Sequence, residues 1–358
     1  MAETWRLIDT GLASPGRNIA LNRALLEARH ADEISSTLRF GRSTRCVLLG
    51  CADSAEHVVD KGYCRAHDIP IQRRITNSAA AYFDERQLLW ELYLHRRDVG
   101  NADLRAVLRR ICHAAATAFS ALGVDARYRV PGEIEVDGRT IATAACAVDG
   151  AAILIQATLL MDLDATNALK TLRVPGERLG PNAIAAIHER TVGLKGILGR
   201  QPDSRTVKHN LAEAFESEFD VEFREADLSL SEDARYRVAL RQIETIDWIS
   251  LVARPASEMP LLEAVHELQG GSLRVLVAYD VKAQTIRRVW LSGDRLVGCR
   301  RAILDLEAAL RDVPVGRLAH RIERFFATRP LDMRMPAATD FLTLVRRALQ
   351  QPVLARNS

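Results

Sequence analysis

The chain of 358 residues has little lysine, few aromatic residues and little net charge. Aromatic residues make up 5% of it, and the formal net charge is only +3. So small a charge gives no support for a nucleic-acid partner or for an anionic membrane surface. Lysine occurs at five positions, Lys61, Lys170, Lys195, Lys208 and Lys282. A site that requires a lysine therefore has few candidates in this chain.

Cysteine pairs with zinc-ligand spacing are also missing. The six cysteines are scattered, without a CxxC pair, so neither a zinc site nor a disulfide framework is expected in a chain of this length. The first residues lack the positive charge and apolar run of a signal peptide. The most apolar stretch, residues 151–163, is too short to span a membrane. We expect a cytoplasmic protein without a membrane partner.

The apolar pattern, by contrast, is rich in both helical and strand signals. Hydrophobic residues make up 48% of the chain and charged residues 27%, as in ordinary globular proteins. Helical periodicity predicts helices at residues 15–30, 101–122, 206–218 and 229–246. Strands are predicted at residues 37–40, 46–50, 69–74, 87–94 and 151–161, and a hairpin at residues 133–142 around an Asp-Gly turn. The chain therefore mixes helices and strands.

A second unit is predicted after a polar, proline-containing linker at residues 253–260. Two strands, at residues 273–280 and 285–291, are followed by helices at residues 301–310, 316–328 and 339–350. Such a set is large enough for a small α+β domain of its own, over residues 262–350. The preceding domain then spans residues 1–253.

Five stretches occur in an order that resembles the lipoate–protein ligases. They are residues 18–26, 63–76, 133–142 and 158–164, and the hairpin after residue 272 with Gly293-Asp294 behind it. This family shares its fold with biotin–protein ligases and lipoyl (octanoyl) transferases. The resemblance implies an α+β fold, a biotin/lipoate-ligase-like mixed sheet with flanking helices, plus a small α+β C-terminal accessory domain.

The resemblance also implies a two-step reaction. Lipoate or a related acyl acid is joined to AMP from ATP with Mg²⁺, and the acyl group then passes to a lysine of a lipoyl carrier domain. The first step brings two anions together and the second develops negative charge on a tetrahedral intermediate. Both steps need fixed positive charge and backbone donors at the reacting centre.

The family's binding loop has an Arg-Arg pair, three glycines and then an aromatic-His-Asp run. Here the arginines, an aromatic residue and the Asp are present, but the three glycines and the His are replaced. Ser or Ala adopts a left-handed glycine conformation at a cost of roughly 1 kcal/mol. Arg73 and Arg74 either bind phosphate or cap the end of a strand in a structural ion pair. The implied ligand-binding positions are Arg73, Arg74, Asn77, Ser78, Ala79, Tyr82, Asp84 and Thr158.

The family's catalytic lysine falls at Thr140 in the hairpin. No lysine lies between Lys61 and Lys170, and Arg139 is expected on the opposite face of the strand. Losing a buried charged contact costs on the order of 2–4 kcal/mol in the transition state. The family's metal-associated acid corresponds to Glu133, which is either a Mg²⁺ ligand or an exposed strand carboxylate.

A cysteine-dependent acyl transfer is the other chemistry to consider. In cysteine-dependent branches one nucleophile position precedes a Pro-Gly, which is Val130 here. Cys146, six residues after Thr140, either carries an acyl group as a thiolate or is a small core residue. Whether the chain is an enzyme stays open. The sequence favours a lipoate–protein ligase-like activity, and the alternative is a non-catalytic homologue that binds an acyl group, a nucleotide or a carrier domain.

Overall fold

The computed structural model describes residues 3–51, 53–76, 78–100, 102–173, 183–250, 259–268, 271–292, 300–327 and 336–351. Asn77, Gly293, Asp294 and residues 253–258 of the expected linker lie outside these ranges. By their contacts the residues divide into two compact units: residues 1–51, 55–76 and 80–251 form the first, and residues 52–54, 77–79 and 252–358 the second.

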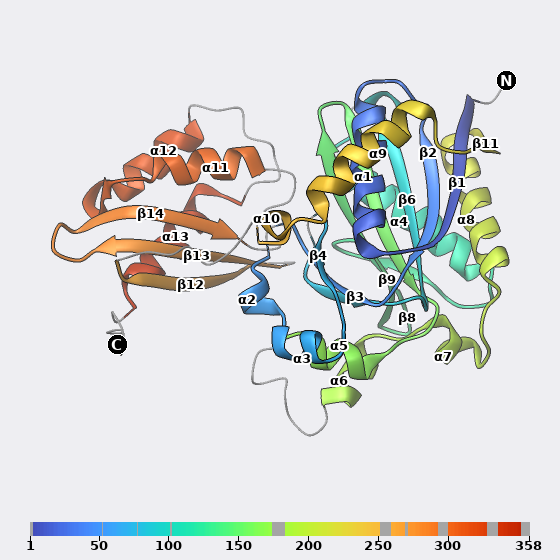
Figure 1. The fold of residues 1–358 in the computed structure, drawn as a ribbon, viewed down its shortest axis with the longest axis horizontal. Helices are drawn as coiled ribbons and strands as arrows, with labels where there is room; N and C mark the ends of the chain where they lie inside the picture. Colours follow the sequence, from blue (N-terminus) through green and yellow to red (C-terminus); the bar gives the residue numbers. More distant parts are fainter. Residues whose placement is uncertain are drawn as a thin grey trace. The chain divides into compact units, whose positions relative to one another are not determined.

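The first unit is built on a mixed sheet (Figure 1), for which the described residues supply eight strands. In spatial order these are β11 (Val221–Glu225), β1 (Glu3–Ala13), β2 (Thr37–Ser43), β6 (Gln87–His95), β10 (Ala152–Leu160), β9 (Arg139–Asp149), β8 (Glu133–Val136) and β7 (Arg127–Arg129). The pairs β11–β1 and β1–β2 are parallel, and the remaining neighbours are antiparallel. The expected mixed sheet is confirmed.

Helices cover both faces of this sheet. Helix α1 (Pro15–His30), which begins at the predicted residue, packs against Tyr93 of β6, and α9 (Leu230–Ile243) lies against α1. On the other face, Trp90 contacts Phe215 of α8 (Ser204–Phe219), with ring centroids 5.4 Å apart. Helix α4 (Leu104–Ser120) packs beside α8. Trp90 and Tyr93 are three residues apart on one strand, so they face opposite sides of the sheet.

A smaller sheet in the same unit carries the candidate binding loop. It pairs β4 (Ile71–Arg73), β3 (Cys46–Leu49) and β5 (Ala81–Phe83). Short helices complete the unit: α2 (Ala55–Val58), α3 (Lys61–Ala66), the 3₁₀ turn Arg96–Val99, α5 (Ala165–Thr171), α6 (Ala183–Arg190), α7 (Leu194–Leu198) and α10 (Ile246–Ile249).

The second unit has its own apolar core. Its sheet contains β12 (Leu261–Leu268), β13 (Gly271–Asp280), β14 (Thr285–Ser292) and β15 (Val313–Pro314). The 3₁₀ turn Val315–Arg317 and the helices α11 (Arg300–Ala309), α12 (Leu318–Ala327) and α13 (Ala338–Leu349) follow. Val275, Ile322 and Phe341 are all in the buried cluster. The expectation of two strands was wrong, because β12 carries charged residues in an irregular alternation and β15 is only a two-residue strand.

Strand β1 was also missed by the sequence analysis. Its buried Trp5 and Ile8 are three residues apart, and its pairing with β2 shifts register between Asp9 and Leu12. This irregularity hides the period of two by which a strand is recognised. In the described part of the chain, no helix is long and apolar enough to cross a membrane.

Candidate functional site

A register shift in the hairpin β8–β9 decides where Thr140 points. Glu133 pairs with Thr143 and Glu135 pairs with Thr140, so β9 advances three residues while β8 advances two. Residue 141 is the extra residue, and the strand bulges there. Because cross-strand partners share a face, Thr140 and Thr143 lie on the same side of the sheet, although they are an odd number of residues apart.

The face of the sheet that carries Thr140 continues onto β10, and Cys146 does not lie on it. Thr143 pairs with Thr158, so Thr140 and Thr158 share a face. Ala147, four residues after Thr143 and on the same face, packs with apolar residues of α1. Cys146 is adjacent to Ala147, so it faces the other side of the sheet. The structure therefore brings Thr140 and Thr158 to one face and does not bring Cys146 to it.

The Thr140 hydroxyl is held by a charged cluster. Arg129 Nη2 donates to Thr140 Oγ1 at 2.8 Å, and Thr140 Oγ1 donates to Glu133 Oε2 at 3.1 Å. Arg129 also bonds Glu133 through Nε at 2.9 Å and pairs with Glu135 at 2.9 Å. The hydrogen bond to Glu133 raises the pKa of Arg129. Arg129 was not among the residues expected from the sequence, although its four-residue spacing to Glu133 indicates a possible pair.

Glu133 is thus an ion-pair partner in this structure. It is the expected magnesium-associated acid, and its carboxylate is occupied by Arg129 and Thr140. Among the described residues, no three or more His, Cys, Asp or Glu side chains form a group that could hold a metal ion. The role of Glu133 as a Mg²⁺ ligand stays a prediction.

Folding brings a lysine close to the strand of Thr140. The Thr140 carbonyl accepts a hydrogen bond of 3.0 Å from the amide of Val192. Three residues on, Lys195 binds Met161 O through its amide at 3.0 Å and Asp162 Oδ2 through its ammonium at 2.9 Å. Thr140 and Lys195 are 55 positions apart in the chain, so the sequence did not indicate this placement.

Arg73 is fully buried and binds backbone carbonyls. Its guanidinium donates to Gly50 O at 2.8 Å, to Ile249 O at 2.8 Å and to Trp248 O at 3.2 Å. The Trp248 indole returns a hydrogen bond of 3.0 Å to Arg73 O. Arg73 therefore fastens α10 to the end of β4. These contacts are structural, and a phosphate-binding role for Arg73 stays a prediction.

Arg74 occupies a different position. Only 6% of it is exposed, its amide donates to Leu49 O at 2.9 Å, and its guanidinium carbon lies 5.7 Å from the centre of the Phe83 ring. Among the replaced glycine positions, Ser78 is half-buried and Ala79 is exposed, and both are grouped with the second unit. Their ligand-binding roles remain predictions.

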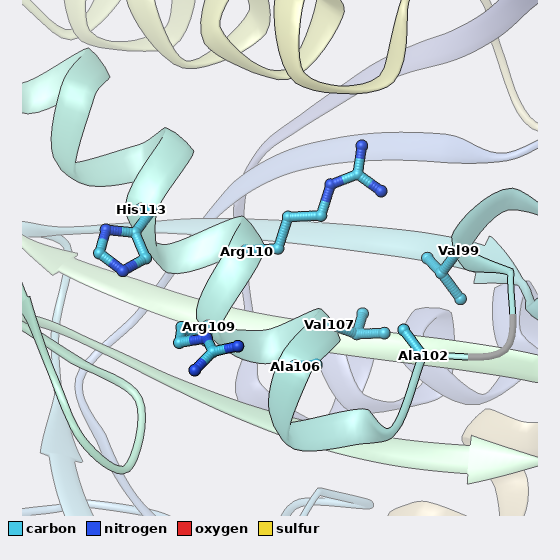
Figure 2. A pocket seen from close by; sticks show the side chains of 7 residues that line it. All are labelled: Val99, Ala102, Ala106, Val107, Arg109, Arg110 and His113. Carbon is cyan, nitrogen blue, oxygen red and sulfur yellow. The ribbon is translucent and has the colours of Figure 1, made fainter.

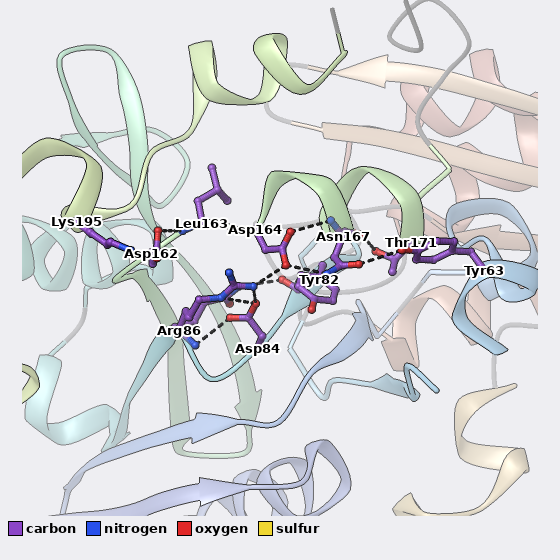
Figure 3. A network of polar contacts seen from close by, with 11 residues as sticks. Tyr63, Tyr82, Asp84, Arg86, Asp162, Leu163, Asp164, Asn167, Thr171 and Lys195 are labelled. Carbon is purple, nitrogen blue, oxygen red and sulfur yellow. Dashed lines mark hydrogen bonds and ion pairs between the residues drawn. The ribbon is translucent and has the colours of Figure 1, made fainter. Parts of the chain in front are cut away.

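Tyr82 and Asp84 belong to a polar network at the end of β5 (Figure 3). Arg86 binds Asp84 through Nε at 3.0 Å and Asp164 through Nη2 at 2.6 Å. Asp164 in turn caps α5 and accepts from the Asn167 amide at 2.9 Å. Burial, with the nearby Asp84 carboxylate, raises the pKa of Tyr82 to about 12. The network holds β5 and the segment after β10 in a fixed relation.

A second buried network includes Thr76, which lies three residues after the end of β4. Gln156 accepts from Thr76 Oγ1 at 2.6 Å and donates to Asn22 Oδ1 at 2.8 Å and to Glu91 Oε1 at 3.1 Å. Glu91 pairs with Arg39 at 2.6 Å, and both side chains are completely buried. All these partners of Gln156 belong to the buried interior of the first unit.

A cavity of about 250 Å³ lies elsewhere in this unit, against the first turns of α4 (Figure 2). Arg109, Arg110 and His113 line it, together with Val99, Ala102, Ala106 and Val107. The Arg110 guanidinium contacts Glu218 and lies 4.6 Å from the centre of the Phe219 ring. The cavity contains none of the site residues expected from the sequence, and we do not take it as the candidate site.

Comparison with known proteins gives a consistent result. The model of the lipoyl protein ligase A/B catalytic domain matches residues 14–216. Octanoyltransferase LipM of Moorella thermoacetica is 24% identical over 268 residues, 69% of this chain and 98% of the relative. A structure from an archaeal lipoylation system, a bi-partite lipoate protein ligase and its E2 lipoyl domain from Thermoplasma acidophilum, has a TM-score of 0.63 at 23% identity, over 71% of this chain and 99% of that chain. P. falciparum LipL1 in complex with lipoate has a TM-score of 0.74 at 13% identity, over 97% and 100%.

The family match covers more than half of the chain, so the chain belongs to the lipoyl protein ligase A/B catalytic domain family. Members of this group include octanoyltransferases and lipoate–protein ligases. The solved structures, at 13% and 23% identity, show the fold, which is that of lipoate ligases. The resemblance drawn from the ordered sequence landmarks is confirmed at this level.

Proposed function

We propose that the chain is a ligase-type member of its family. It joins lipoate or a related acyl acid to AMP and transfers the acyl group to a lysine of a lipoyl carrier domain. The substrates are ATP and the acid, the partner is the carrier protein, and we assign the reaction to the cytoplasm.

The observation that carries this proposal concerns the two nucleophile positions considered from the sequence, Val130 and Cys146. A transferase that takes its acyl group from another carrier needs a nucleophile to hold it, and a thiolate is the usual group. Val130 stands at one nucleophile position, and Cys146 lies on the face of the sheet opposite Thr140. Neither residue supplies a thiol to the Thr140 face. Activation of the acid by ATP requires no thiol.

The extent of the structural likeness supports the same conclusion. The likeness to LipL1 extends over 97% of the chain and so includes the second unit. The match to LipM covers 69% of the chain and almost the whole of that transferase. The part of the chain that LipM does not match thus has, over most of its length, a counterpart in LipL1, whose structure was solved in complex with lipoate.

The chain's own residues then have distinct tasks. Glu133, Thr140 and Arg129 form a polar cluster at the hairpin, and the Asp84–Arg86–Asp164 network fixes the neighbouring segments. Mg²⁺ commonly keeps its waters and uses one or two carboxylates with substrate phosphates. Glu133 offers one such carboxylate, already paired with Arg129.

The test is acid-dependent exchange of pyrophosphate into ATP, measured with lipoate, octanoate and biotin. Exchange with at least one acid is expected, and it should persist in a Cys146→Ser variant. No exchange with any acid would refute the formation of an adenylate. A hydroxylamine-sensitive acyl–protein adduct that disappears in Cys146→Ser would instead establish thiol chemistry.

A second function is favoured by the geometry of Arg73. Its guanidinium donates hydrogen bonds to backbone carbonyls of α10 and of the residues after β3. A chain in which the family's lysine and glycines are replaced fits a non-catalytic homologue, which binds a carrier domain or an acyl group without joining them. Stable binding of a carrier domain without modification in the presence of ATP is the result that distinguishes it.

A further inference from the structure

We infer that Arg129 is the anion-binding residue of this site. Its guanidinium contacts the carboxylate or phosphoryl oxygen of the acyl-adenylate, and so takes the place of the lysine missing at position 140. This inference rests on the proposed function, because it names a residue for that same reaction. It is carried by the position and contacts of the Arg129 side chain.

The side chain reaches across the hairpin from the edge of the sheet. Arg129 lies on β7 and pairs with Glu133 of β8, yet its Nη2 bonds Thr140 on β9, one strand further. The sequence separates Arg129 from Thr140 by eleven residues, so only the antiparallel order of β7, β8 and β9 brings them together. A cation therefore stands at the side-chain oxygen of Thr140.

Two carboxylates fix the direction of this cation. Glu133 accepts from Nε at 2.9 Å, and Glu135 pairs with Nη1 at 2.9 Å. A planar guanidinium held at two of its edges loses little further freedom when it binds an anion. Such prior orientation is what makes a fixed charge effective at a reacting centre. Glu133 and Glu135 thus act on the reaction through Arg129, as positioning residues.

The neutral contacts of Arg129 are the ones that a substrate anion replaces. Nη2 donates to the Thr140 hydroxyl, and Nη1 lies 3.5 Å from the Gly138 carbonyl. A charged oxygen is a stronger acceptor than a hydroxyl or a carbonyl. The side chain is 43% exposed, so an anion can reach it. Thr140, released as an acceptor, can rotate its hydroxyl to donate to the same anion.

A matched control is present on the same strand. Arg127 lies two residues before Arg129 on β7, is 73% exposed and pairs with Asp125. It makes no contact with Thr140 among the interactions of the described residues. Arg127→Gln removes the same charge at nearly the same distance from the sheet edge. A general electrostatic effect on binding would appear in both variants, whereas the loss of a specific contact would appear in Arg129→Gln alone.

The experiment measures binding of lipoyl- and octanoyl-sulfamoyl adenosine, unreactive analogues of the acyl-adenylates, to the full chain by calorimetry. Arg129→Gln is expected to weaken binding by about tenfold or more, as for loss of a charge-assisted hydrogen bond. Arg127→Gln should change it by less than about twofold on the same basis. The double variant Arg129→Gln/Thr140→Lys, which moves the charge to the neighbouring side chain, should regain most of the affinity. Thermal melting of each variant shows that it is folded.

The outcomes separate the two proposals. If wild-type protein binds an analogue and Arg129→Gln binds it equally well, the role of Arg129 is refuted and the proposed function stands. The role is refuted also if Arg127→Gln weakens binding to the same extent or if Thr140→Lys restores nothing. Arg129-dependent binding without any pyrophosphate exchange would refute the ligase function alone. Wild-type protein that binds neither analogue would overturn both.

Discussion

The hydroxyl of Thr76 donates a hydrogen bond of 2.6 Å to the side-chain oxygen of Gln156, and so joins the segment after β4 to the middle of β10. Thr76 is fully buried, and Gln156 also bonds Asn22 and Glu91. The bond holds Thr76 in place, and the segment expected to hold the acyl-adenylate begins directly after it. The loop's first residue is therefore fixed by the sheet.

Thr76→Val should destabilise the protein, since it leaves the buried Gln156 oxygen without this donor. A loss of about 1–3 kcal/mol in the free energy of unfolding is expected. Thr76→Ser, which keeps the hydroxyl, should retain most of that stability. Urea unfolding of the three proteins measures the difference. Equal stability of Thr76→Val and the wild type would show that the bond contributes nothing.

The buried pair Arg39–Glu91 should be sensitive to removal of one partner. Both side chains are completely buried, and Tyr93 Oη donates to Glu91 Oε2 at 2.7 Å. Arg39→Met leaves an uncompensated carboxylate and should cost about 3–5 kcal/mol in unfolding free energy. Arg237→Gln, which breaks an exposed pair with Asp233, should cost less than about 1 kcal/mol. A similar loss in both variants would contradict this assignment.

Arg73 should behave as a structural residue. Arg73→Met removes the donors that hold the carbonyls of Trp248 and Ile249, so α10 should detach locally. Hydrogen–deuterium exchange of peptides covering residues 246–250 is expected to speed up markedly. ATP affinity, measured by calorimetry, should fall no more than in a variant destabilised at another buried site, such as Arg39→Met. A selective loss of ATP binding would instead establish the phosphate contact expected from the sequence.

The charge of Asp164 should stabilise the fold only above acidic pH. Burial alone would raise its pKa, but the Asn167 amide and Arg86 outweigh it and lower the pKa below the ordinary value. A carboxyl with a lowered folded-state pKa stabilises the protein above its unfolded-state pKa of about 3.9, and this contribution disappears as the pH falls through the folded-state pKa.

Asp164→Asn tests that contribution, because Asn still caps a helix N-terminus. At pH 7 the variant should lose on the order of 1 kcal/mol in unfolding free energy, since the partner Arg86 is partly exposed. The gap between variant and wild type should narrow as the pH is lowered below about 4. Unfolding midpoints measured from pH 7 to pH 3 give the profile, and a gap that is constant with pH would contradict it.

Much of the fold was predictable because its signals are local. The helices α1, α4, α8 and α9 and the hairpin β8–β9 follow from apolar periodicity and from one Asp-Gly turn. Strand β1 was not predictable in this way, because its register shift breaks the alternation. Strand β12 contains Glu263, His266 and Glu267, which obscure its period. The register shift of β1 becomes visible only in its pairing with β2.

The contacts within the candidate site could not be predicted from the sequence, and its functional role stays a prediction. The resemblance located Thr140, but a period of two would put Cys146 on its face, and the bulge at residue 141 reverses that relation. Arg129 escaped notice because its contact with Thr140 depends on the order of three strands. The sequence also gives no sign that Arg73 contacts α10, and its ligand-binding role stays a prediction. Each of these relations involves residues that tertiary pairing brings together.

The most direct test of the central claim is the mass of a lipoyl carrier domain after incubation with the full chain, ATP, Mg²⁺ and either lipoate or octanoate. The account predicts addition of one acyl group to a carrier lysine, dependent on ATP, retained in Cys146→Ser and strongly reduced in Arg129→Gln. An unmodified carrier with every acid tested, in a preparation that melts cooperatively and binds the carrier, would contradict it and establish the non-catalytic alternative.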